Sequence, residues 1–222
     1  MTTFRRVLRY GAFDALMAVR RPFSQRQRQK RMAKFVSRMK ITGGERVIDL
    51  GGTIEFWNDL TIPLKITVVN LPGEVTRLEN GTVHDVTFRE GNACAVDFAE
   101  DMSFDIAFSN SVIEHVGDED RQVAMAGEVR RLAPNYWVQT PSIWFPIEAH
   151  NHMPFWWFYP EALKARFIAN WRRKLPAWTT MVEETTVIPR KDMQRFFPDA
   201  QIYTERVLGW TKCYTAYKSQ RP

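Results

Sequence analysis

The sequence predicts an α/β protein whose mostly parallel sheet is covered by helices on both faces. Two observations carry this prediction. Short runs rich in Val, Ile and Phe alternate with helical stretches along residues 46–140, which is typical of βαβ units. The first of these runs ends directly at Gly51-Gly52, and glycines at a strand end let a ligand approach bare backbone. At 222 residues the chain is long enough for one domain with a sizeable core.

The basic charge is concentrated before the first strand. Residues 1–40 hold twelve Lys and Arg and one acidic residue, a net charge of +11 in a chain of net charge +6, so the remainder carries −5. Apolar residues recur at helical spacing over residues 4–19 and 32–39, which predicts two amphipathic basic helices. We expect their apolar faces to pack on the body; the alternative is contact with an anionic membrane or polyanion.

We therefore divide the chain into a basic helical extension, residues 1–40, and a main domain, residues 41–222. The predicted strands of the main domain are Arg46–Leu50, Lys65–Leu71, Val83–Arg89, Phe104–Asn110, Asn135–Thr140, Gln201–Val207 and Lys212–Lys218. The predicted helices are a short one at Phe56–Leu60, then Asp118–Leu132, then Pro160–Lys174, which has proline in its first turn.

A dense aromatic run, Phe155-Trp156-Trp157-Phe158-Tyr159, follows the fifth predicted strand. Aromatic clusters are most often part of a core. Five consecutive side chains cannot all face one side of a regular element, so we expect some of these rings at a surface or in a pocket.

Small and polar residues follow the strand ends in chain order. They are Asp49-Leu-Gly51-Gly52-Thr53, Asn70-Leu71, Gly91-Asn92-Ala93 and Ser109-Asn110-Ser111-Val-Ile-Glu114-His115. In open α/β sheets, ligands bind outside the carboxyl ends of the strands, where these residues are expected to meet. This order resembles the class I S-adenosylmethionine-dependent methyltransferases, in particular the methyltransferase type 11 group, over residues 46–217. The most specific match is Ser103–Val116, which resembles that group's fourth-strand motif.

The resemblance implies a Rossmann-like, doubly wound, seven-stranded sheet with an antiparallel last strand, and S-adenosylmethionine as cofactor. It places the methionine part of the cofactor at Gly51, Gly52 and Thr53, with Asp49 orienting the ammonium group. Further implied contacts are Asn70 and Leu71 at the ribose, Asn92 and Ala93 at the adenine, and Asn110 and Ser111 at the methyl-transfer end. The chain departs from the family where Thr53 replaces a glycine and where Asn70 and Asn92 replace carboxylates.

The candidate catalytic residues are Glu114, His115 and His150. Methylation of an oxygen benefits from removal of its proton, and histidine titrates near neutral pH. A divalent metal site at Glu114 and His115, completed by Glu148, His150 and His152, is an alternative, but the favoured interpretation has no bound metal. Equally open is a structural role for each histidine.

The resulting hypothesis is an S-adenosylmethionine-dependent methyltransferase acting on an oxygen or nitrogen atom of a small molecule, sugar or lipid-linked acceptor. The alternative is a methyltransferase-like domain without activity that serves as a membrane or protein adaptor. A dinucleotide-dependent dehydrogenase is disfavoured, because the glycine pattern and the strand-2 acid are missing. Two isolated cysteines and the lack of a secretory pattern predict a cytoplasmic protein, with peripheral contact to anionic membrane through residues 1–40.

Overall fold

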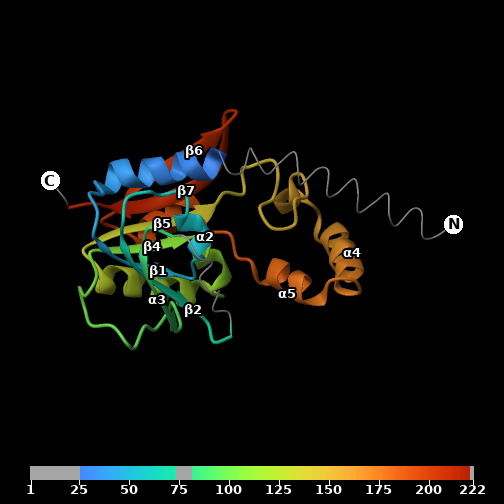
Figure 1. The fold of residues 1–222 in the computed structure, drawn as a ribbon. Helices are drawn as coiled ribbons and strands as arrows, with labels where there is room; N and C mark the ends of the chain where they lie inside the picture. Colours follow the sequence, from blue (N-terminus) through green and yellow to red (C-terminus); the bar gives the residue numbers. More distant parts are fainter. Residues whose placement is uncertain (1–25, 74–81, 221–222) are drawn as a thin grey trace.

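The computed structural model describes residues 26–73 and 82–220. A helix spans residues 26–39. The elements that follow it are β1 (Arg46–Leu50), α2 (Ile54–Trp57), β2 (Lys65–Asn70), β3 (Asp85–Glu90), β4 (Ile106–Asn110), η1 (Ile113–His115), α3 (Glu119–Leu132), β5 (Asn135–Pro141), η2 (Trp156–Phe158), α4 (Glu161–Arg172), α5 (Pro176–Glu184), α6 (Arg190–Phe196), β6 (Gln201–Val207) and β7 (Trp210–Lys218) (Figure 1).

All seven strands form one sheet in the order β3-β2-β1-β4-β5-β7-β6. Strands β1 to β5 run parallel, whereas β7 runs antiparallel to both β5 and β6. The predicted fold class is therefore confirmed. Strand order reverses between β1 and β4, and the crevice outside their carboxyl ends is where such sheets bind ligands.

Helices cover the two faces of the sheet as separate layers (Figure 1). The alternation of side chains along β1 shows why both faces need cover: Val47 belongs to one apolar cluster, and Ile48 and Leu50 belong to the other. Helix 26–39 and α2 pack on the Val47 side, while α3 and α6 pack on the Ile48 side.

Helix 26–39 is the second of the two predicted amphipathic helices, and its apolar face packs on the sheet as expected. Met32, Phe35 and Met39 are buried in the same cluster as the central strands. The Phe35 ring makes edge contacts with Trp57, Phe108 and Trp137. The first predicted helix lies outside the described residues, and the division at residue 40 stays a prediction.

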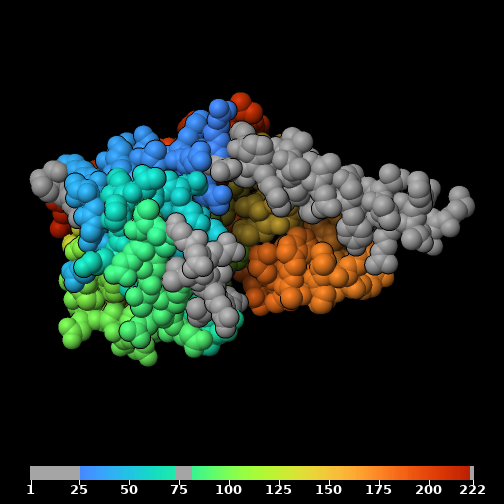
Figure 2. Space-filling view, viewed as in Figure 1, coloured from blue at the N-terminus to red at the C-terminus, as the bar shows by residue number. Residues whose placement is uncertain are grey.

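Residues 142–188 leave the sheet after β5 and return to it before α6. Helices α4 and α5 contact each other and lie to one side of the sheet (Figure 1). In the space-filling view they protrude from the body as a separate lobe (Figure 2). The mixed burial of the aromatic run confirms the prediction for it, since Trp156 is buried whereas Phe155 and Phe158 are exposed.

Strand and helix boundaries differ from prediction by a few residues at several ends. Pro141, predicted to close the fifth strand, belongs to β5, and β4 begins at Ile106 rather than Phe104. Helices α5 and α6 were not predicted. None of the helices within residues 26–73 and 82–220 has the length and apolar content needed to cross a membrane.

Replacing Phe35 with alanine is expected to lower the free energy of unfolding by about 3–5 kcal/mol, the usual cost of emptying a fully buried phenylalanine site. Urea denaturation followed by circular dichroism measures it. The matched control on the exposed face of the same helix is Ser37→Ala, which should change stability by less than about 0.5 kcal/mol. Equal effects of the two substitutions would show that helix 26–39 does not pack on the sheet in solution.

Candidate active site at the carboxyl ends of β1 and β4

The turn after β1 has no room for side chains on its two glycines. Gly51 has φ +75°, and a Cβ added there would lie 2.5 Å from Cγ1 of Val112, which follows β4. A Cβ on Gly52 would lie 1.8 Å from Oδ2 of Asp49. Thr53 follows in extended conformation as the residue preceding α2. The backbone is thus left bare at the crevice between β1 and β4, as a closely bound ligand requires.

Asp49 lies directly behind this turn and is completely buried. Its Oδ2 accepts a hydrogen bond of 2.7 Å from the indole Nε1 of Trp57, while its Oδ1 has no partner among the described residues. Burial raises the pKa of Asp49 to about 7, against the opposing effect of the Trp57 hydrogen bond. A carboxylate oxygen without a partner at this position suits the binding of a cationic group.

Asn70 ends β2 and supports the glycine turn from the neighbouring strand. Its Nδ2 donates a hydrogen bond of 2.9 Å to the carbonyl oxygen of Gly52. A carboxylate could not make this bond, because it only accepts hydrogen bonds. This bond explains why an amide rather than a carboxylate stands at residue 70. The side-chain oxygen of Asn70 is the atom that could accept a hydrogen bond from a ribose hydroxyl. Leu71, the next residue, is exposed.

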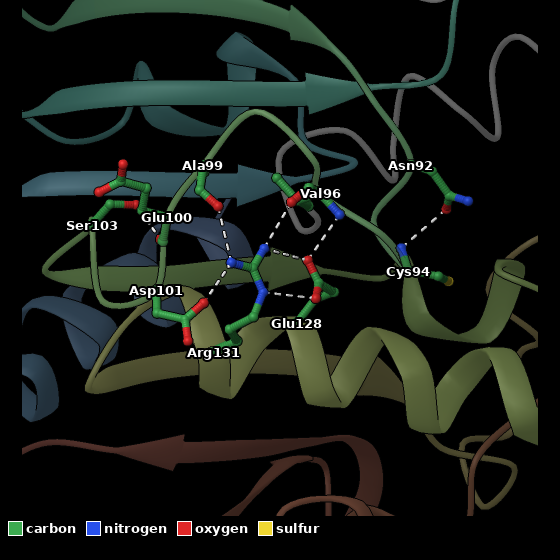
Figure 3. A network of polar contacts seen from close by, with 9 residues as sticks. All are labelled: Asn92, Cys94, Val96, Ala99, Glu100, Asp101, Ser103, Glu128 and Arg131. Carbon is green, nitrogen blue, oxygen red and sulfur yellow. Dashed lines mark hydrogen bonds and ion pairs between the residues drawn. The ribbon is translucent and has the colours of Figure 1, made fainter.

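Asn92 and Ala93 lie in the loop between β3 and β4. The side-chain oxygen of Asn92 accepts a hydrogen bond from the backbone N–H of Cys94, two residues on (Figure 3). That bond stabilises the local turn, so the Asn92 oxygen is engaged within the loop. Ala93 packs against the apolar cluster beneath α3.

Arg131 of α3 fixes the remainder of this loop (Figure 3). Its guanidinium donates to the carbonyl oxygens of Val96 and Ala99 and forms ion pairs with Glu128 and Asp101. One side chain thereby holds the backbone on the expected adenine side of the site, and the pKa of Arg131 is raised by these acceptors, Glu128 foremost.

Asn110 and Ser111 end β4 on the other side of the crevice. Ser111 has φ +58°, and its hydroxyl donates to Oε1 of Gln139 at 3.1 Å. Arg31, from helix 26–39, donates to Oδ1 of Asn110 at 2.9 Å and to the same Gln139 oxygen at 3.1 Å. Arg31 also pairs with Glu205 of β6 at 3.0 Å.

No sequence pattern singled out three polar residues of this network, namely Arg31, Gln139 and Glu205. Arg31 and Glu205 are 174 residues apart in the chain, and Arg31 and Gln139 are 108 apart. No local pattern predicts such partners. The sequence shows that many arginines precede the first strand, but it does not show which of them becomes nearly buried in the fold.

The predicted catalytic residues Glu114, His115 and His150 come together beside the end of β4. Each offers one ligand atom, and these three atoms lie within 4.8 Å of one another. Nε2 of His115 is 2.9 Å from Nε2 of His150, and Nδ1 of His150 is 2.8 Å from Oε1 of Glu148. Glu114 is fully buried and accepts a 3.1 Å hydrogen bond from Thr140 of β5.

The surroundings shift the pKa of every acid and base in this cluster. Burial raises the pKa of Glu114 to about 7, and burial together with the charge of His150 lowers that of His115 to about 4. Burial acts to lower the pKa of His150, but the hydrogen bond and charge of Glu148 outweigh it and raise the pKa. His152 lies outside the group of three ligand atoms.

Comparison with known proteins agrees with this geometry. Residues 51–138 match the family model described as a methyltransferase domain. Residues 51–138 therefore form a methyltransferase domain similar to those of the class I S-adenosylmethionine-dependent methyltransferases. The match confirms the family resemblance drawn from the sequence, and S-adenosylmethionine is the methyl donor that such a domain uses.

Two curated relatives are uncharacterized proteins of Mycobacterium tuberculosis, from strains CDC 1551 and H37Rv. Each is 35% identical to this chain over 76 residues, which are 34% of this chain. The match covers only 25% of the length of each of these relatives.

Solved structures share the fold at low identity. A phosphoethanolamine N-methyltransferase of Haemonchus contortus, in complex with S-adenosyl-L-methionine, superimposes with a TM-score of 0.53 at 12% identity, over 86% of this chain and 53% of that one. The magnesium protoporphyrin IX methyltransferase of Synechocystis PCC 6803 gives a TM-score of 0.50 at 12% identity, over 88% of this chain and 84% of that one.

The residues of the methyltransferase domain fit the cofactor. The glycine turn leaves the backbone accessible where the methionine part would bind, and Asp49 has an unpartnered carboxylate oxygen directly behind it. The unpartnered oxygen is unusual for a purely structural turn, since buried polar atoms normally have partners.

Replacing Asp49 with asparagine is expected to separate stability from cofactor binding. The raised pKa means that a neutral Asp49 favours folding below about pH 4 and that this contribution is lost as the pH rises through about 7. The advantage of Asp49→Asn over wild type in free energy of unfolding should therefore grow between pH 5 and pH 8, by up to about 3 kcal/mol. Urea denaturation at both pH values measures this.

The same substitution should weaken S-adenosylmethionine binding about tenfold in calorimetry, because a charge-assisted bond to the ammonium group is lost. The exposed Asp97 provides the control, since Asp97→Asn should change neither quantity. A stability difference between Asp49→Asn and wild type that is the same at pH 5 and pH 8 would contradict the buried, titrating Asp49.

Proposed function

We propose that this protein transfers the methyl group of S-adenosylmethionine to an oxygen or nitrogen atom of a small-molecule, sugar or lipid-linked acceptor. The observation that carries the proposal is the cluster of Glu114, His115 and His150 next to Ser111, at the expected methyl-transfer end of the cofactor site. Substrate-handling groups are expected there, because the methyl carbon must lie in line with the attacking atom, and positioning is the main contribution of the protein.

The protonation states of the cluster favour an acceptor that loses a proton. The lowered pKa of His115 keeps its ring neutral at pH 7, but a group with a pKa of about 4 is a weak base there. Glu114, with a pKa of about 7, is the member of the cluster whose pKa suits proton exchange at that pH. A hydroxyl or an ammonium group needs such a base, whereas a carbon acceptor without an acidic proton does not.

Exposed aromatic residues before α4 favour an acceptor with apolar character. Trp144 and Phe158 contact each other with ring centroids 5.6 Å apart, and both are exposed. Phe155 contacts Trp210 of β7 at 6.2 Å, and these two rings are also exposed. Exposed aromatic side chains grouped beside a site favour binding of an apolar molecule or surface. This favours the lipid-linked member of the proposed acceptors.

We propose an anionic membrane as a binding partner of this protein. Leu208, at the protruding turn between β6 and β7, is 92% exposed (Figure 1). A cavity of about 370 Å³ beside it is lined by Arg26, Lys30 and Arg206. An exposed apolar tip next to basic side chains is the combination that binds the interface of an anionic bilayer. The contribution expected of residues 1–25 lies outside the described residues.

Cofactor binding is tested by calorimetry with S-adenosylmethionine. Gly51→Val should abolish measurable binding, because any Cβ at this position collides with Val112 and the positive φ disfavours valine. The control is Gly127→Ala in α3, where an added Cβ meets nothing within 4 Å; binding should be unchanged and stability higher by about 0.5–1 kcal/mol. If wild type does not bind the cofactor, the adaptor alternative replaces the enzyme.

Membrane contact is tested by sedimentation with vesicles containing phosphatidylserine. Leu208→Asn should weaken binding about fivefold, the loss of roughly 1 kcal/mol of apolar burial, without disturbing the fold, since Leu208 has φ +50° and asparagine tolerates that conformation. Leu175→Asn, an exposed leucine elsewhere in the lobe, is the control and should bind like wild type. A full-length protein that ignores these vesicles at low salt would contradict the proposal.

A further inference from the structure

The short contact between His115 and His150 raises the question of what lies between their two ring nitrogens. Their Nε2 atoms are 2.9 Å apart, with the ring planes perpendicular. At this distance two nitrogen lone pairs would repel each other, so either a proton carried by one of the nitrogens or a metal ion must lie between them. The hydrogen-bond partners of the other two ring nitrogens decide where the ring protons are.

His150 carries a proton on Nδ1, because its partner is a carboxylate. Oε1 of Glu148 lies 2.8 Å from Nδ1, and Oε2 of Glu148 accepts 2.6 Å hydrogen bonds from the backbone N–H groups of His150 and Asn151. A glutamate held by three donors is ionised and only accepts hydrogen bonds. With its proton on Nδ1, a neutral His150 presents a bare Nε2 to His115.

His115 carries its proton on Nδ1 as well. The hydroxyl of Thr185 lies 3.3 Å from Nδ1 of His115 and donates its single proton to the carbonyl oxygen of Met181 at 2.8 Å. The lone pair of the Thr185 oxygen therefore accepts from the ring. Both Nε2 atoms are left unprotonated, each facing the other.

Glu114 is the third member of this arrangement. It is 0% exposed, one of its oxygens accepts from Thr140, and its Oε1 has no hydrogen-bond partner among the described residues. A proton shared between the two histidines would satisfy the nitrogens but would leave Oε1 of Glu114 buried without a partner, at a cost of about 1–3 kcal/mol. A cation bound by all three residues satisfies every one of these atoms.

We infer that Glu114, His115 and His150 form a binding site for a divalent transition-metal ion. Two imidazole nitrogens bonded to one ion at about 2.0–2.1 Å lie about 2.9–3.4 Å apart, which brackets the distance seen here. Hydrogen bonds from the far ring nitrogens, to Glu148 and Thr185, are the support that metal-binding histidines usually have. The mixed nitrogen and oxygen ligands favour zinc, manganese, iron(II) or cobalt(II) over magnesium.

The use of this metal in catalysis rests on the proposed function, whereas metal binding itself does not. Three protein ligands leave coordination positions open for an acceptor oxygen next to Ser111. Binding to the ion would lower the pKa of that oxygen, so that its proton would pass to water. The oxygen would then form its bond to the methyl carbon as the bond between that carbon and the cofactor sulfur breaks, which leaves S-adenosylhomocysteine. The expectation from the sequence that no metal is bound would then be wrong.

The test is titration of the full-length, cofactor-free protein with Co²⁺, followed by calorimetry and by visible absorption. Wild type should bind one ion per chain with the absorption of a nitrogen-ligated site. His150→Ala and Glu114→Gln should abolish that binding. Glu148→Gln should weaken it about 10–100-fold by loosening His150.

His152→Asn is the matched control in the same loop, because His152 has φ +59°, which asparagine tolerates, and it is not part of the cluster. It should bind Co²⁺ like wild type, and circular dichroism of every variant checks that each is folded. Wild type without bound Co²⁺, or binding that survives in His150→Ala, overturns the metal site and leaves a shared proton. Failure of the proposed function is a separate result, namely loss of S-adenosylmethionine binding or of methyl transfer by a protein that still binds Co²⁺.

Discussion

The site depends on one steric constraint, the lack of space around the turn that follows β1. Gly51 is closed in by Val112 from β4, and Gly52 by the carboxylate of Asp49. Because the turn contacts both neighbours, it couples the first strand to the fourth across the point where strand order reverses. Asn70 completes the support from the second strand through the Gly52 carbonyl. A larger side chain at either glycine would displace all three strand ends together.

The opposite side of the crevice is built from polar contacts rather than close packing. Arg31 connects the ends of β4, β5 and β6, and Thr140 connects β5 to Glu114. Such buried networks specify geometry well when every member has a partner. Two buried oxygens, Oδ1 of Asp49 and Oε1 of Glu114, have no hydrogen-bond partner within the described chain. One belongs to the end of β1 and the other to η1, so each lies near one of the two parts of the proposed site.

The sequence predicted the sheet well because its information there is local. Val47, Ile48 and Leu50 need cover on both faces, and the glycines after them need a turn, so β1 was predicted with its observed bounds. Helix α4 was predicted from its opening proline, whereas α5 and α6 were missed because helices of nine and seven residues are too short to show a clear periodicity. Glu114, His115 and His150 were named individually, but only the folded chain shows that two imidazoles meet and that Glu148 fixes one of them. The role of Arg31 could not be read locally, since its partners come from three distant strands.

The long reach of Arg31 also has a consequence for synthesis of the chain on the ribosome. Helix 26–39 is made before every strand of the sheet, yet Arg31 forms its ion pair with Glu205 only when β6 has been added. Until then Met32, Phe35 and Met39 have no completed sheet to cover. Contacts between distant segments form slowly, and apolar surface exposed in the meantime promotes aggregation. The apolar face of helix 26–39 is therefore exposed to aggregation on the ribosome until the sheet is complete.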